Sequence, residues 1–103
     1  MSDPGDVERE RKREREREPE TVRCWLVERD YDTQGLVTVV YSTRDGRRRR
    51  LFQWAAASLD RREITAAIDV DPNSLEPVDP EDRERYAAEA RRVAERRDPD
   101  EEI

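Results

Sequence analysis

The segment LVTVVYSTRDGRRRRLFQW, residues 36–54, decides the fold. Two runs rich in β-branched and aromatic residues flank Asp45-Gly46, a dipeptide that favours a tight turn between two strands. A turn at this dipeptide sets the register of the strands, so we expect Val39 to lie opposite Phe52. The segment therefore predicts an antiparallel hairpin with apolar side chains gathered on one face.

A further strand is expected over residues 21–31, TVRCWLVERDY, before a three-residue loop that ends at Gly35. Glycine at that position can take the left-handed conformation that such a loop needs. The loop pairs Tyr31 with Val37. Burial favours this register, because one sheet face then collects eight apolar side chains: Trp25, Val27, Tyr31, Val37, Val39, Tyr41, Phe52 and Trp54. In it, Val27 lies opposite Tyr41.

Residues 63–71, EITAAIDVD, fit two structures. Apolar and polar residues alternate from Ile64 to Asp71, which is typical of a strand. The preceding residues 60–63 resemble a helix capping box, which would favour a helix instead. We prefer a fourth strand, because the run is β-branched and stops at Pro72. The proline-rich residues 71–80 are expected to form a loop.

A C-terminal helix is predicted from Pro80 to about Arg97. Asp79 occupies the capping position, Pro80 the first helical position, and acidic residues follow in the first turn. One narrow apolar stripe is made by Tyr86, Ala90, Val93 and Ala94. Such a small-faced helix suits the aromatic sheet face. The fold class is thus α+β, an antiparallel β-meander of three or four strands packed against one C-terminal helix.

Length and charge indicate a single domain. Residues 1–20 alternate arginine and glutamate without an apolar stripe, so we expect a disordered tail. Residues 21–98 form the domain, and residues 99–103 an acidic end. The chain carries 27 acidic and 21 basic residues, for a net charge of −6.

The acidic composition, with 20 arginines, one lysine and no histidine, is similar to that of proteins from salt-loving microbes. Three segments, CWLVERDYDTQGLVTVVY, ITAAIDVDPNSLEPV and ERYAAEA, resemble a family of short, acidic, uncharacterised haloarchaeal proteins. The resemblance implies a halophilic, cytoplasmic protein. It carries over no function and no site residues.

The residue types argue against an enzyme. Histidine, the commonest general base, is absent, and Cys24 has no partner that could activate it. Residues 69–80 begin like a calcium loop but lack its glycine and its final glutamate. We therefore predict no catalytic, cofactor or metal residues. No apolar run is long enough to span a membrane, and no secretory signal opens the sequence.

The sharpest functional signal is the run of four arginines after the predicted turn: Arg47, Arg48, Arg49 and Arg50. In a strand, alternate residues face opposite sides. The run fits a solvated turn, a contact with carboxylates of a protein partner, or a nucleic-acid contact with bases stacked on aromatic residues. The aromatic candidates are Trp25, Tyr41, Phe52 and Trp54. We expect a non-enzymatic protein–protein interaction module; the alternative is weak RNA or DNA binding through the basic hairpin.

Self-association is a further expectation. The strand over residues 21–31 would lie at the edge of a meander, and its segment CWLV, residues 24–27, carries neither charge nor proline to protect it. Two copies could pair there as a homodimer, with Arg23 of one opposite Glu28 of the other.

Overall fold

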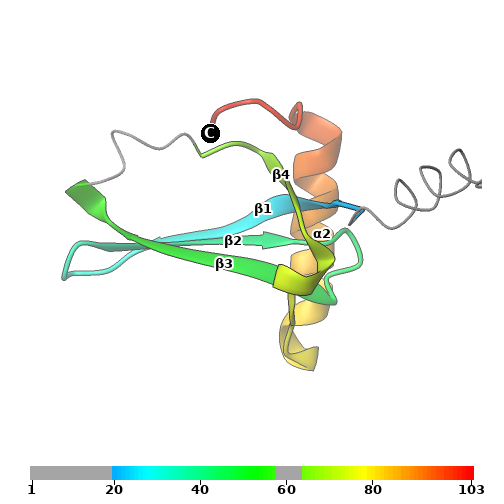
Figure 1. The fold of residues 1–103 in the computed structure, drawn as a ribbon, viewed down its shortest axis with the longest axis horizontal. Coiled ribbons are helices and arrows are strands. Elements are labelled where there is room, and N and C mark those ends of the chain that lie inside the picture. Colours follow the sequence, from blue (N-terminus) through cyan, green and yellow to red (C-terminus); the bar gives the residue numbers. More distant parts are fainter. Residues whose placement is uncertain (1–19, 58–63) are drawn as a thin grey trace, which may run out of the picture.

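The computed structural model describes residues 20–57 and 64–103, which form one five-stranded antiparallel sheet and one α-helix (Figure 1). The strands lie in the order β4-β1-β2-β3-β5. Their bounds are β1 Val22–Tyr31, β2 Leu36–Ser42, β3 Arg48–Ala55, β4 Ala67–Val70 and β5 Glu76–Pro77; a 3₁₀-helix η2 spans Pro72–Ser74 and helix α2 spans Pro80–Arg96. The α+β class is confirmed. The tail over residues 1–19 and the capping box over residues 60–63 lie outside the described residues.

Both predicted turns are present and set the predicted register. Gly35 and Gly46 have φ angles of 82° and 71°, the left-handed conformation that glycine takes most readily. Tyr31 pairs with Val37, and Val39 pairs with Phe52. The β1-β2-β3 meander is therefore the one that the two turn sequences predict.

One prediction about β1 is wrong. Its register shifts between Leu26 and Glu28, so Leu26, and not Val27, pairs with Tyr41. Val27 is the extra residue of a β-bulge, and an extra residue moves every side chain before it to the opposite face. Trp25 and Val27 therefore leave the predicted aromatic face.

The prediction of a strand within residues 63–71 is confirmed, and this strand takes an unexpected place. β4 pairs with the outer edge of β1, from Val22 opposite Val70 to Trp25 opposite Ala67. The stretch of β1 on which a homodimer was expected is thus occupied by the chain itself. A second copy could pair there only by displacing β4.

The C-terminal residues continue the pairing on the far side of residues 64–67. The amides of Ala66 and Ala67 donate to the carbonyls of Glu101 and Pro99 at 2.8 and 2.9 Å, and the amide of Ile103 donates to the Ile64 carbonyl at 2.8 Å. Residues 99–103 are therefore attached to the sheet, beyond the expected boundary at residue 98.

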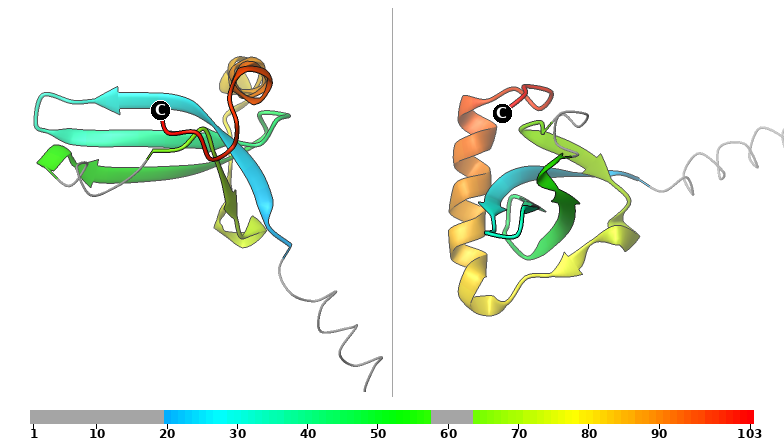
Figure 2. Two further views of the ribbon diagram at one scale, coloured as in Figure 1. Left: turned by 90° about the horizontal axis from the view of Figure 1, so that it is seen from above. Right: turned by 90° about the vertical axis from the view of Figure 1, so that its left-hand side faces the viewer.

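The sheet is strongly curled, and the chain links its two edges. From β4 it runs through η2 to β5, which pairs with the outer edge of β3 at Arg48 and Arg49 (Figure 2). The proline-rich stretch expected as a loop thus contains η2 and a short strand. The inside of the curl holds one buried cluster: Cys24, Leu26, Val37, Val39, Tyr41 and Ile64.

Helix α2 covers the outer face of the sheet, which corrects the expected packing. The helix has the predicted start and apolar stripe, but its buried residues Tyr86 and Ala90 pack with Val40 and Trp25 respectively. The inner aromatic face is covered instead by the curl and by Ile64. Since both faces of β1 are covered, its adjacent residues Trp25 and Leu26 can both be buried.

Candidate functional site

The basic turn between β2 and β3 is docked on α2. A Cβ atom added to Gly46 would lie 2.1 Å from the Arg83 carbonyl oxygen and 2.8 Å from the Ala87 nitrogen. The amide of Val78, in the residues leading to α2, donates to the Arg47 carbonyl at 2.9 Å. Only a residue without a side chain allows so close an approach, so the turn is held in one position against the helix.

Asp45 organises the turn from within. The Thr43 hydroxyl donates to the Asp45 carboxylate at 2.6 Å, and the Arg47 amide donates to it at 3.0 Å. These hydrogen bonds, that of Thr43 first, lower the pKa of Asp45 below its ordinary value. Asp45 therefore stays ionised while it shapes the loop.

The four arginines of the run divide between surfaces, as their alternation predicts. Arg47 and Arg48 are exposed. Arg49 is half-buried on the α2 side of the sheet, and its Nε donates to Glu76 at 3.0 Å. Arg50 lies on the inner face with its guanidinium 4.7 Å from the centre of the Phe52 ring. The run is thus a basic turn with one internally paired arginine, and not a single patch.

The aromatic candidates are also divided. Phe52 and Trp54 stack on the inner face with ring centres 5.5 Å apart, and the Tyr41 ring meets Phe52 edge-on at 6.2 Å. Tyr41 is buried, and its hydroxyl donates to the Thr65 carbonyl at 2.8 Å. Trp25, which the sequence predicts on the same face as these rings, is buried beneath α2 on the other face of the sheet.

This arrangement leaves little ring surface for a nucleic-acid base. Trp54 stacks on the Phe52 ring, and the Arg50 guanidinium also lies over that ring. Bases stack on proteins through exposed ring faces, so Phe52 is poorly placed to receive one. What the inner face does present is a row of arginine and aromatic side chains along β3.

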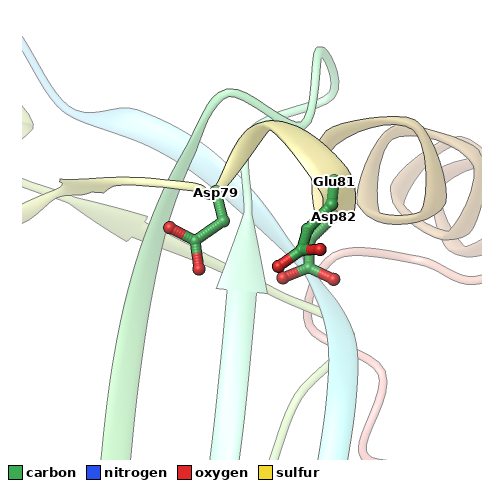
Figure 3. Close-up of side chains that lie close together, drawn as sticks. All are labelled: Asp79, Glu81 and Asp82. Atoms are coloured by element: carbon green, nitrogen blue, oxygen red, sulfur yellow. The ribbon is translucent and has the colours of Figure 1, made fainter.

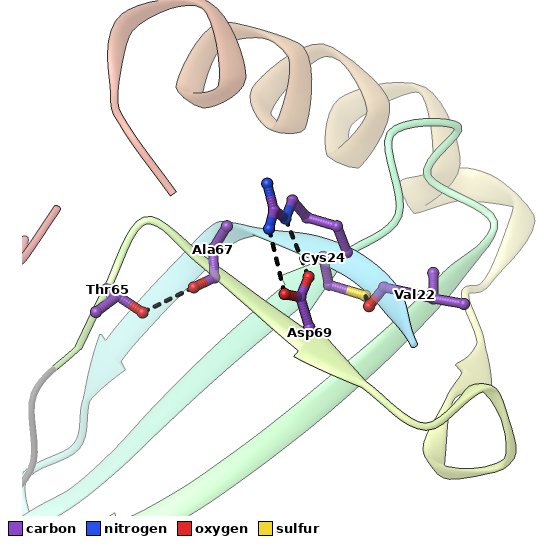
Figure 4. A network of polar contacts seen from close by, with 6 residues as sticks. Val22, Cys24, Thr65, Ala67 and Asp69 are labelled. Carbon is purple, nitrogen blue, oxygen red and sulfur yellow. Dashed lines mark hydrogen bonds and ion pairs between the residues drawn. The ribbon is translucent and has the colours of Figure 1, made fainter. Parts of the chain in front are cut away.

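Asp69 and Asp71, which open the stretch that begins like a calcium loop, each have a partner within the protein. Asp69 forms a two-bond ion pair with Arg23, at 3.0 and 3.2 Å (Figure 4). The Asp71 carboxylate accepts a hydrogen bond from the Asn73 amide at the start of η2. A different group, Asp79, Glu81 and Asp82, lies together at the start of α2 (Figure 3). Acidic residues are usual in the first turn of a helix, where they complement its dipole.

Cys24 is a structural thiol. It is fully buried in the inner cluster, and its Sγ donates weakly to the Val22 carbonyl at 3.9 Å (Figure 4). Burial raises the pKa of the Cys24 thiol to about 11. The thiolate that nucleophilic chemistry needs is therefore disfavoured at neutral pH.

Sequence patterns did not predict a second basic surface. A groove between α2 and β1 is lined by arginines from both elements: Arg29, Arg92, Arg96 and Arg97. Arg29 lies far from the other three in the sequence, and the position of α2 beside β1 brings it to them. The excess of arginine over lysine is the one feature of the sequence that points to arginine-lined surfaces, and it does not show where on the fold they lie.

Among the described residues, no helix combines the length and the apolarity that crossing a membrane requires. No curated protein and no solved structure is similar enough to the chain to count as a match. Residues 18–103 match the model of a family of unknown function, DUF7967. The match covers all the described elements of the fold, and the chain belongs to this family.

Proposed function

We propose that the protein is a non-enzymatic protein-interaction module whose basic β2–β3 turn binds carboxylates of a partner protein. The observation that carries this proposal concerns Arg44, Arg47 and Arg48. All three are exposed, and none forms an ion pair with a carboxylate in the described parts of the chain. Although the described residues offer many carboxylates, none of them forms an ion pair with these three guanidinium groups.

The rigidity of the turn supports the same proposal. Its backbone is held by Gly46 against α2 and by the Asp45 carboxylate within the loop. A surface that is already ordered loses less conformational entropy when it binds. Planar guanidinium groups also form paired hydrogen bonds with carboxylates, which makes such contacts specific in direction.

The row along β3 extends this surface. Arg50, Phe52 and Trp54 lie on one face of the strand, and arginine and aromatic residues are enriched in protein interfaces. The same row disfavours nucleic acid, because Trp54 and Arg50 already lie against the Phe52 ring. RNA or DNA binding remains the alternative, and the experiment must distinguish it from peptide binding.

We further propose that the protein works in a salt-rich cytoplasm. The acidic balance of 27 to 21 residues, with one lysine among the bases, supports this. At ~1 M salt the screening length is only ~3 Å, so long-range attraction to a polyanion is lost. Short hydrogen bonds between guanidinium and carboxylate groups persist better, which again favours a protein partner.

The test uses a panel of peptides that differ in the number and spacing of their carboxylates, beside mixed RNA and DNA oligonucleotides. We expect acidic peptides to bind at high salt and oligonucleotides not to. Arg47→Glu or Arg48→Glu should weaken peptide binding about tenfold, the cost of losing a charge-assisted hydrogen bond and adding a repulsion.

The matched control is Arg91→Glu, the same charge reversal at an exposed arginine of α2. It should leave peptide binding unchanged. Equal losses from the turn and from Arg91 would show a general charge effect and would contradict the proposal. Binding of oligonucleotides without binding of peptides would replace it with the nucleic-acid alternative.

A further inference from the structure

A groove of about 300 Å³ lies between the C-terminal half of α2 and β1. It is separate from the basic turn, which packs against α2 near Arg83 and Ala87, whereas the groove follows the helix from Glu89 to Arg97. The C-terminal segment returns from the end of α2 towards the sheet, and Ile103 lines part of the groove (Figure 1).

The β-bulge opens this part of the sheet. β4 pairs with β1 as far as Trp25, and the Leu26 amide donates to the Ala66 carbonyl at 2.9 Å; beyond Leu26 no described strand pairs with this edge of β1. The bulge at Val27 then turns the strand, and the consecutive residues from Leu26 to Arg29 all line the groove. Bulges are frequent beside functional sites, because they redirect side chains in this way.

The charges within the groove do not cancel. Arg92 is held by both carboxylate oxygens of Glu89, at 2.6 and 3.1 Å, and Arg97 by Glu101 at 3.1 Å. Arg96 has no carboxylate partner among the described residues. Arg29 donates to the main-chain oxygen of Ile103, the last residue of the sequence, at 3.3 Å and lies over the Tyr31 ring; among the described residues it has no side-chain carboxylate partner.

The acidic residue Glu28, which also lines the groove, is bound from the α2 side. One of its oxygens lies 3.5 Å from Arg85, and the other accepts a hydrogen bond from the Tyr86 hydroxyl at 3.2 Å. Arg29 and Arg96 therefore line the groove with positive charge that no described side-chain carboxylate neutralises. The apolar part of the lining is supplied by Leu26, Val27 and Val93.

We propose that this groove binds a small organic anion, a phosphate or carboxylate group carried on an apolar body. Arg29 and Arg96 hold the anionic group through their planar donor forks. Val27 and Val93 contact the body. The volume is at the small end of ligand pockets, roughly 300–1,000 Å³, so the body is about the size of one aromatic ring.

The experiment is a titration of the isotope-labelled full chain, followed by the NMR signals of its backbone amides. The probes are phenyl phosphate, benzoate, inorganic phosphate and the neutral benzyl alcohol, at millimolar concentrations. We expect both aromatic anions to shift the amides of residues 27–29 and 93–97. Tighter binding of phenyl phosphate identifies a phosphate ligand, and tighter binding of benzoate a carboxylate ligand. Inorganic phosphate, which lacks the apolar body, should bind more weakly than phenyl phosphate.

Two matched variants locate the binding. Arg96→Gln should weaken the binding of the anion about tenfold, the effect of losing one charge-assisted hydrogen bond. Arg91→Gln, on the same helix but outside the groove, should have no effect. Thermal unfolding of both variants checks that the fold is intact.

The proposal is overturned if neither aromatic anion shifts the groove amides, or if benzyl alcohol binds as tightly as benzoate. Equal losses in the Arg91 and Arg96 variants would also overturn it, because they would show attraction to the charged surface in general. None of these results bears on the β2–β3 turn, so the two proposals succeed or fail separately.

Discussion

At the residue scale, the two left-handed glycines have different surroundings. Gly46 lies against the backbone of α2, whereas nothing approaches within 4 Å of a Cβ added to Gly35. Both positions favour glycine because their φ angles, 71° and 82°, are left-handed. At Gly46 a side chain would also overlap with α2. Comparing substitutions at the two glycines therefore distinguishes the effect of backbone strain from that of steric overlap.

Gly46→Ala should therefore destabilise the protein more than Gly35→Ala. A left-handed alanine costs about 1–2 kcal/mol, and overpacking against α2 adds about 1–3 kcal/mol at Gly46 alone. Chemical denaturation of the two variants measures the difference. Equal losses of unfolding free energy would mean that the turn does not press on the helix.

A second prediction at this scale concerns Cys24 and pH. Burial raises the pKa of the thiol from 9.0 to about 11, so the folded state holds this proton more tightly than the unfolded state. The associated stability is complete below pH 9 and is lost as the pH rises to about 11. Tyr41 and Tyr86, whose pKa values are also raised by burial, add to the alkaline loss.

The unfolding free energy, measured from pH 8 to pH 11, should fall more steeply in the wild type than in Cys24→Ala. The native thiol should also resist alkylation near pH 8 and react once the chain is unfolded. Rapid alkylation of the folded protein would show that the thiol is accessible.

At the scale of elements, β4 depends on the C-terminal segment. β4 has only four residues, and β1 pairs with one of its edges. The main chain from Ile64 to Ala67 is held on its other side by residues 99–103. Ala67, the first residue of β4, is thus bonded on both sides, so residues 99–103 fix the start of the strand against β1.

Removal of residues 99–103 should thus destabilise the domain. The three main-chain hydrogen bonds to residues 64–67 are lost, at about 1 kcal/mol each, for a total of about 3 kcal/mol. Thermal unfolding of the truncated chain measures the effect. The control is the full chain with Asp100→Asn and Glu102→Gln, which changes the charge but keeps the backbone bonds. An unchanged midpoint after truncation would show that β4 is stable without this segment.

At the scale of the whole molecule, charge is distributed unevenly. Residues 69–103 hold 13 acidic and six basic residues, whereas residues 21–68 hold six acidic and nine basic residues. Repulsion within the acidic part opposes folding, and dissolved salt screens it. Salt also weakens the six ion pairs between described residues, but these are exposed or half-exposed and contribute little. The stability gained by screening the repulsion should therefore exceed the stability lost from the ion pairs.

The midpoint of thermal unfolding should accordingly rise with potassium chloride. A variant with Glu84→Gln, Glu95→Gln and Asp100→Asn, three exposed acids without ion pairs among the described residues, should gain less from the same salt. Sucrose, which stabilises proteins without screening charge, should raise both midpoints equally. A salt response equal in the two proteins would assign the effect to something other than charge repulsion.

Local patterns were enough to determine several features of this protein from its sequence. The turns at Gly35 and Gly46, the strand pairs next to them and the start of α2 depend on residues close together in the chain. The alternating sides of the arginine run follow from strand geometry alone. The α+β class follows from these elements.

The packing of these elements on one another is visible only in the tertiary structure. β1 carries a bulge at Val27 and is covered on both faces, by α2 on one side and by the curl of the sheet on the other. That single extra residue moved Trp25 beneath the helix and away from the predicted aromatic site. The groove at Arg29 and Arg96 likewise depends on contacts between β1 and α2. Local periodicity can predict a strand or a helix, but the side on which two elements pack is set by the total apolar surface that the whole chain must bury.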